Sequence, residues 1–177
     1  MKKILLVLLT LSVFMSGCVN AKARTPSNVT KMSQKNDIEV TVLETIPVNV
    51  SIFGSKKGDV GLRLKIRNNS SEVKYVVWSA SSLGFDGIVS RVANGNDKVI
   101  NINSVVPNTA LMAGRETTVV IYAADVIQYS EKTPYVSAYY YTETPIKDKV
   151  ELLLSYSGND TSKLEQAQYD IELPTSK

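Results

Sequence analysis

The sequence predicts an all-β protein, an antiparallel β-sandwich of about seven to nine strands over residues 37–174. Apolar and polar residues alternate with a period of two along most of this region, which is typical of strands with one buried and one solvated face. Turn-forming residues recur every 8–15 residues or so, and no amphipathic stretch of ordinary helical length is present. The chain has 177 residues, which is enough for one domain.

The clearest alternation lies at residues 60–68, where valine, leucine and isoleucine are separated by glycine, arginine and lysine. Asn68-Asn69-Ser70-Ser71 supplies turn residues, and the strand pattern resumes at 73–79. These two runs are predicted to pair as a hairpin. Trp78 lies in the second run, and we expect it to pack in the core between two sheets rather than to serve as a ligand platform.

The remaining strands follow from shorter runs of the same kind. Residues 117–123 are apolar on both faces, which predicts a central position in a sheet. Asp86-Gly87 predicts a tight turn inside the run 83–92. Residues 125–134 leave room for a short helical turn. The other predicted strands are 38–42, 48–52, 98–104, 135–143, 149–156 and 166–173.

The N-terminus has the order of an export signal. Lys2 and Lys3 precede an apolar run over residues 4–15, and small residues follow. About a dozen apolar residues are too few to cross a bilayer, which needs roughly 20. We therefore expect this segment to direct export and to be removed, rather than to remain as a membrane span.

The end of the apolar run, Met15-Ser16-Gly17-Cys18, resembles the lipobox of bacterial lipoproteins. The resemblance implies that the thiol of Cys18 receives a diacylglyceryl group and that a peptidase then cuts between Gly17 and Cys18. Two acyl chains anchor a protein stably, whereas one chain binds only marginally. The membrane lipid is therefore an expected partner through acylated Cys18, and the expected location is the cell envelope.

This cut divides the chain into four parts: a removed signal peptide at 1–17, lipidated Cys18 with a flexible tether to residue 36, the β-sandwich at 37–174, and a tail at 175–177. The predicted tether is rich in Lys, Ser, Thr and Asn. The residues after Cys18 lack the aspartate that resembles an inner-membrane retention signal. In a Gram-negative cell the outer membrane, facing the periplasm, is therefore favoured.

A second cleavage position competes with the lipobox. Ala21-Lys22-Ala23 fits the small-x-small rule of ordinary signal peptidase. A cut after Ala23 would discard Cys18 and release a soluble secreted protein. The lipoprotein cut is favoured because the apolar run ends at the cysteine.

A broader resemblance covers residues 61–123. It is carried by the order Leu62 to Asn69, Val77-Trp78-Ser79-Ala80-Ser81-Ser82, Asp86-Gly87, Arg91-Val92, Pro107 and Ala113-Gly114. This order is similar to a loose set of uncharacterised bacterial envelope lipoproteins with an immunoglobulin-like sandwich. The resemblance implies an immunoglobulin-like fold, and it names no activity.

Composition narrows the chemistry. The formal charge is +3 and falls to about +1 once the signal peptide lysines are removed, which argues against nucleic-acid binding. The chain has no histidine, which removes most familiar triad, acid–base and zinc chemistry. Its single cysteine leaves no intramolecular disulfide. We expect no cofactor, no metal and no catalytic residue.

Tyrosines at 135–141 are the first candidate binding surface. Tyr135, Tyr139 and Tyr141 fall on one face of a predicted strand. Tyrosine combines a rigid apolar body with a polar tip, which suits contact with a sugar or a protein. Ordinary cross-strand aromatic packing accounts for the same pattern and is favoured.

Three other constellations are weaker. Arg63, Lys65, Arg67 and Lys74 form a basic stripe that could contact anionic headgroups or a protein, although a solvated strand face is favoured. Ser71-x-x-Lys74 has the spacing of penicillin-binding enzymes but lies on a predicted hairpin, and Lys-Thr-Gly is absent. Asp59, Asp86, Asp97 and Asp125 lack the spacing of a calcium loop and read as turn residues.

Three functions remain open. The favoured one is a non-catalytic binding or assembly module, with a protein or glycan partner, held at the membrane where its effective concentration is high. The second is a structural envelope subunit that pairs through a sheet edge. An enzyme is disfavoured because no activated nucleophile or carboxylate pair is recognisable.

Overall fold

A computed structural model describes residues 23–31, 37–47, 59–96, 99–100, 107–126, 128–130, 139–141 and 145–174. Within these ranges the chain is all-β and antiparallel, as predicted, and its only helices are two 3-10 turns, η2 (Trp78–Ala80) and η3 (Ala124–Val126). The strands are β1 (Asn28–Lys31), β2 (Ile38–Pro47), β3 (Asp59–Asn68), β4 (Lys74–Val76), β5 (Ser82–Phe85), β6 (Ile88–Asn96), β7 (Val99–Ile100), β8 (Thr109–Leu111), β9 (Glu116–Ala123), β10 (Gln128–Ser130), β11 (Tyr139–Tyr141), β12 (Lys149–Ser157) and β13 (Leu164–Glu172).

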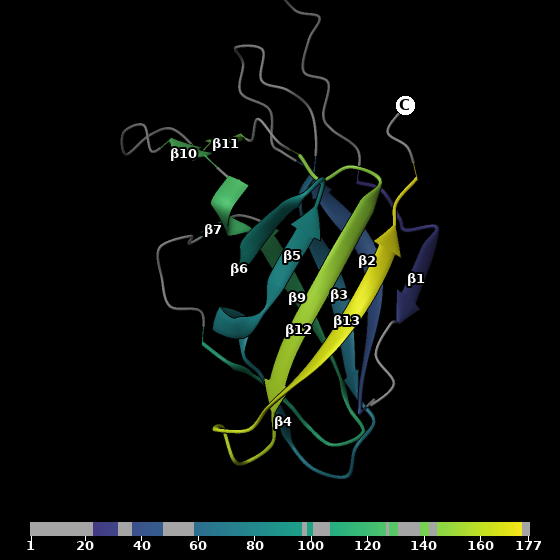
Figure 1. Ribbon diagram of the computed structural model, residues 1–177, viewed down its shortest axis with the longest axis vertical. Coiled ribbons are helices and arrows are strands. Elements are labelled where there is room, and N and C mark those ends of the chain that lie inside the picture. Colours follow the sequence, from purple (N-terminus) through teal and green to yellow (C-terminus); the bar gives the residue numbers. More distant parts are fainter. Residues whose placement is uncertain are drawn as a thin grey trace, which may run out of the picture.

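One continuous sheet folds over on itself to make the sandwich. Its main strand order is β1-β13-β12-β5-β6-β9-β3-β2, with β4 between β12 and β8 and β7 beside β6. β6 belongs to both layers, because its first half pairs with β5 and its second half pairs with β9. Figure 1 shows β12, β13 and β5 in front of β2, β3 and β9.

The core lies between these layers and contains buried side chains from both. Leu62, Leu64 and Ile66 of β3 lie on the same face as predicted and are fully buried. They pack in one cluster with Leu152 and Leu154 of β12. The alternation of the sequence thus corresponds to the two faces of each layer.

Several sequence predictions are confirmed. Asp86 and Gly87 connect β5 to β6 with φ of 53° and 77°, the positive values that a tight hairpin turn requires. β9 lies between β3 and β6, and its residues from 119 to 123 are buried. Trp78 is fully buried, although it lies in η2 rather than in a strand, and its Nε1 donates to Thr109 Oγ1 at 2.8 Å.

The predicted hairpin between 60–68 and 73–79 is wrong. β3 pairs with β2 and β9, whereas β4 pairs with β12 and β8 in the other layer. The hydrogen bonds of Asn68, the first residue of the predicted turn, explain why these two runs do not pair. Asn68 is buried, and its Nδ2 donates to the carbonyls of Glu72 at 2.7 Å and Leu111 at 2.9 Å, which fixes a crossover between layers.

Other predicted strands lie partly or wholly outside the described residues. Residues 48–52 lie outside entirely. Of the runs 98–104 and 135–143, the structure describes only Val99–Ile100 and Tyr139–Tyr141. In the part of the chain that is described, no helix is long and apolar enough to cross a membrane.

Candidate functional site

The residues predicted to form a site are mostly not described. Gly17, Cys18 and Tyr135 lie outside the described residues. Tyr139 and Tyr141 lie at the two ends of β11, which pairs with β10 in a separate two-stranded sheet. Lipidation at Cys18 and a tyrosine contact surface therefore stay predictions.

The basic stripe is not one surface. Arg63 Nε lies 2.8 Å from Glu44 Oε1, and Lys65 and Arg67 lie 3.3 and 3.4 Å from the carboxylate of Glu116. Acidic side chains of β2 and β9 therefore offset the cations of β3. Lys74 is in the other layer, so the four residues do not form the single stripe that the predicted hairpin implied.

Arg24 is the residue that sequence reasoning missed. Its Nε lies 2.6 Å from Asp59 Oδ2, and its Nη1 donates to the carbonyl of Pro174 at 2.8 Å. Its Nη2 donates to the carbonyls of Ile146 and Lys147 at 2.9 and 3.0 Å. The planar guanidinium with its fixed fork of donors suits such a set, and a lysine could not reproduce it.

The Arg24 site is largely removed from water. The side chains of Arg24 and Asp59 are 11% and 5% exposed. Asp148 adds a second carboxylate at 3.4 Å, but it is 53% exposed and interacts more weakly. The three carbonyl acceptors satisfy the remaining donors of the guanidinium, so this largely shielded charge is both paired and hydrogen-bonded.

The backbone around Arg24 is held as well. The Arg24 N–H donates to Thr45 Oγ1, and the Thr45 N–H donates to the Arg24 carbonyl, both at 2.8 Å. Thr45 lies on β2, at one end of the strand order. Further along, the Ser27 N–H donates to the carbonyl of Glu172, and β1 then pairs with β13.

Residues 24–31 therefore run from the edge of β2 to the edge of β13, and we call them the N-terminal clasp. They close the side of the sandwich where the two ends of the folded sheet meet, with β1 lying beside β13 in Figure 1. Inside the clasp, the Tyr169 hydroxyl on β13 donates to the Ile38 carbonyl on β2 at 2.8 Å. The predicted flexible tether over 18–36 is wrong for residues 23–31.

Lys74 forms a second buried cationic cluster. Its side chain is 10% exposed, and its Nζ lies 3.4 Å from Glu165 Oε1, 3.5 Å from Asp37 Oδ2 and 6.0 Å from the centre of the Tyr156 ring. Burial alone would lower the pKa of Lys74, but Glu165 and Asp37 outweigh it and raise that pKa. The Lys74 ammonium is therefore held by two carboxylates.

The four aspartates considered as a calcium site do not converge. Asp59 pairs with Arg24, Asp86 with Lys147, and Asp125 with Arg91 at 2.6 Å. The hydrogen bond from Arg91 lowers the pKa of Asp125. Asp97 lies outside the described residues. Within those residues no group of three or more His, Cys, Asp or Glu side chains could hold a metal ion.

Comparison with known proteins adds no relative. No family model matches the chain, and neither curated proteins nor solved structures give a match. The fold and the site thus define a β-sandwich that its own N-terminal segment closes.

Proposed function

We propose that the chain is a bacterial lipoprotein, anchored through acylated Cys18, whose immunoglobulin-like sandwich is a non-catalytic binding or assembly module in the cell envelope. One observation carries the proposal. The apolar run of the signal ends at Met15-Ser16-Gly17-Cys18, with small residues directly before the single thiol of the chain. A protein held at a membrane meets other membrane components at high effective concentration, which suits a binding role.

The all-β architecture supports this role. A sandwich presents rigid strands and exposed loops, and such loops are where binding residues concentrate. The expected partner is a protein or a glycan. The predicted surface for it is Tyr135, Tyr139 and Tyr141.

The anchor is tested by mass spectrometry of the mature protein isolated from its own membranes. We expect an N-terminus at Cys18 that carries acyl chains, and we expect Cys18→Ser to leave the membrane fraction. Ala23→Leu is the matched control, because it blocks the competing cut and should change nothing. An unacylated N-terminus at Arg24 would replace this proposal with the secreted soluble protein.

The binding role is tested by crosslinking in the native envelope. A photo-activated side chain at position 139 should capture one defined partner, and the same group at Thr118, an exposed position on β9, should not. Equal capture at both positions would contradict a role for the tyrosine strand.

A second function is favoured by the position of β2. This strand has ten residues and lies at the end of the strand order, so it offers an edge to another chain. The clasp covers it at Thr45, and a register shift interrupts it between Val42 and Glu44. Because the Ile38 carbonyl already accepts from Tyr169, edge pairing would use Glu39 to Val42.

Edge pairing is tested with two cysteine variants. Thr41 on β2 and Lys65 on β3 are direct cross-strand partners, but only β2 is an edge. If the chain pairs through β2, Thr41→Cys forms a crosslink to its partner in native envelopes and Lys65→Cys does not. Absence of any crosslink at Thr41 would exclude this function.

A further inference from the structure

We propose that the end of the sandwich that holds Arg24 faces the lipid surface in the anchored protein. This inference rests on the proposed lipidation of Cys18. The N-terminal clasp sets this orientation of the domain relative to the lipid. A domain on a long flexible tether would have no fixed orientation, because the tether would turn freely.

The clasp shortens the tether to the segment before Arg24. Six peptide units separate Cys18 from Arg24 in the sequence. Even fully extended, they span at most about 22 Å, at roughly 3.3–3.6 Å per residue. The attachment point on the domain therefore stays within one short segment of the headgroups.

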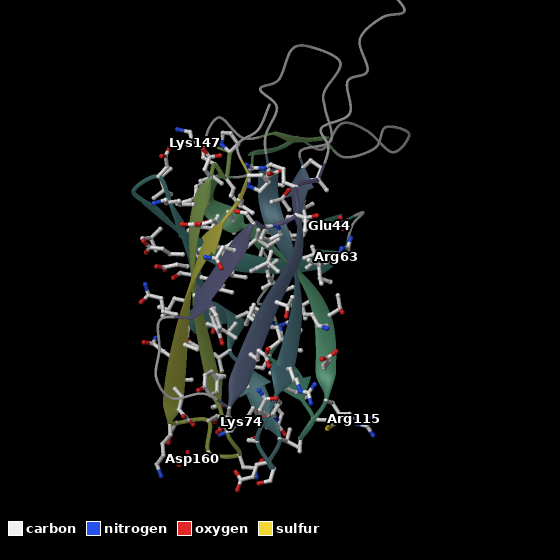
Figure 2. The ribbon with its side chains drawn as sticks, turned by 90° about the vertical axis from the view of Figure 1, so that its right-hand side faces the viewer. Glu44, Arg63, Lys74, Arg115, Lys147 and Asp160 are labelled. Carbon is white, nitrogen blue, oxygen red and sulfur yellow. The ribbon has the colours of Figure 1, made fainter. Side chains whose placement is uncertain are left out.

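That attachment point lies at one end of the long axis. Arg24 contacts the carbonyls of Ile146 and Lys147, and Figure 2 shows Lys147 at the end opposite to Lys74 and Asp160. β12 runs along this axis with nine residues, which corresponds to about 30 Å at roughly 3.4 Å per residue. The far end cannot reach the headgroups unless the domain lies flat or inverts.

The charges at the end that holds Arg24 permit its approach to the lipid surface. Lys147 is exposed and pairs with Asp86, while Asp148 adds a carboxylate and Lys149 a further cation. Both signs are present, so an anionic lipid surface does not repel this end strongly. Arg24 itself is engaged by Asp59 and three carbonyls, so it sets the position of the domain rather than binding lipid.

The experiment measures fluorescence quenching from the lipid surface. Mature acylated protein is reconstituted into phosphatidylcholine vesicles in which a fraction of the headgroups carries a nitroxide. A fluorophore is attached at Lys147→Cys or at Lys163→Cys, both exposed lysines at opposite ends. The thioether of acylated Cys18 does not react with the fluorophore.

We expect quenching at position 147 to be several-fold stronger than at position 163. Equal quenching at both positions, or stronger quenching at 163, would overturn the orientation. A flexible insertion of about 18 residues between Ala21 and Lys22 leaves the fold untouched and lengthens the tether. It should make the two positions nearly equal, and an unchanged ratio would also contradict the inference.

The Cys18→Ser variant distinguishes a failure of the proposed orientation from a failure of the lipoprotein proposal. Without the anchor, neither position should be quenched. If the wild-type chain carries no acyl group, the lipoprotein proposal itself fails. If the chain is acylated but quenching is the same at both ends, only the orientation fails.

Discussion

Arg24 and Lys74 are both cations that lie between two carboxylates and are largely removed from water, but they hold the sandwich in different ways. Arg24 reaches Asp59 at 2.6 Å and three carbonyls at 2.8–3.0 Å. Lys74 reaches Glu165 and Asp37 at 3.4 and 3.5 Å. The Arg24 guanidinium is a fixed fork with each donor directed to an acceptor. The Lys74 ammonium is a point charge with longer contacts.

The difference shows which end of the molecule depends on a single side chain. Arg24 belongs to a segment that sequence patterning assigns to a tether, and its contacts hold that segment on the domain. Lys74 lies in β4, which already pairs with β12 and β8, so its charge adds to a structure that the backbone has fixed. Three substitutions and one change of pH test this difference between Arg24 and Lys74.

Arg24→Ala should have the largest effect. It removes the guanidinium and leaves Asp59 buried without its partner, which should cost about 3 kcal/mol of unfolding free energy. Urea unfolding measures the loss. Arg67→Ala is the matched control, because Arg67 is half exposed and its ion pair with Glu116 is worth less than about 1 kcal/mol. Equal losses in the two variants would contradict the special role of Arg24.

Tyr169→Phe should cost about 1 kcal/mol, the usual net value of one buried hydrogen bond. The lost bond joins β13 to the Ile38 carbonyl on β2, beneath the clasp. If the clasp closes this side of the sandwich, Tyr169→Phe should lose less unfolding free energy in the Arg24→Ala background than in the wild type. The reason is that both side chains hold the same side of the sandwich closed. Strict additivity of the two losses would indicate that they are independent.

Alkaline pH should lower the stability of the fold through two buried tyrosines. Burial raises the pKa of Tyr156 and of Tyr169 above the usual value near 10. Between that value and the raised values the unfolded chain loses these protons while the folded chain keeps them, so stability falls as pH rises. Urea midpoints from pH 8 upward should stay level and then drop above about pH 10. Tyr169→Phe should make the drop shallower.

Lys74→Met should have the smallest effect, about 1 kcal/mol or less, because Asp37 and Glu165 are 48% and 35% exposed and stay solvated without their partner. Because the pKa of Lys74 is raised, its contribution is complete below the unfolded pKa near 10.4 and is lost as pH rises through the folded pKa. Thermal unfolding near neutral pH measures it. A loss as large as that of Arg24→Ala would erase the difference between the two ends.

Sequence reasoning succeeded where a local pattern decides the structure. The alternating runs of β3, β12 and β13 are strands because alternate side chains face one core, and Asp86-Gly87 forms a turn because both residues accept positive φ. The prediction of a hairpin failed at Asn68, because an asparagine in a turn is equally compatible with a crossover between layers. The crossover is fixed by the hydrogen bond from Asn68 to the carbonyl of Leu111, which lies 43 positions away.

The clasp could not be predicted for the same reason. Arg24 is followed by threonine, proline, serine and asparagine, which have the composition of a linker. Its partners Asp59, Ile146 and Pro174 lie 35, 122 and 150 positions further along the chain. No periodicity connects such positions. β1 has only four residues, too few to show an alternation that separates a strand from a polar loop.

Hydrogen exchange at the Thr45 amide, which donates to the Arg24 carbonyl at 2.8 Å, tests whether residues 24–31 are held on the sandwich. In the wild-type chain this amide should be strongly protected. In Arg24→Ala it should exchange much faster, while the Asn68 amide, bonded to the Arg115 carbonyl, stays protected. Fast exchange at Thr45 in the wild type would show that the clasp does not form.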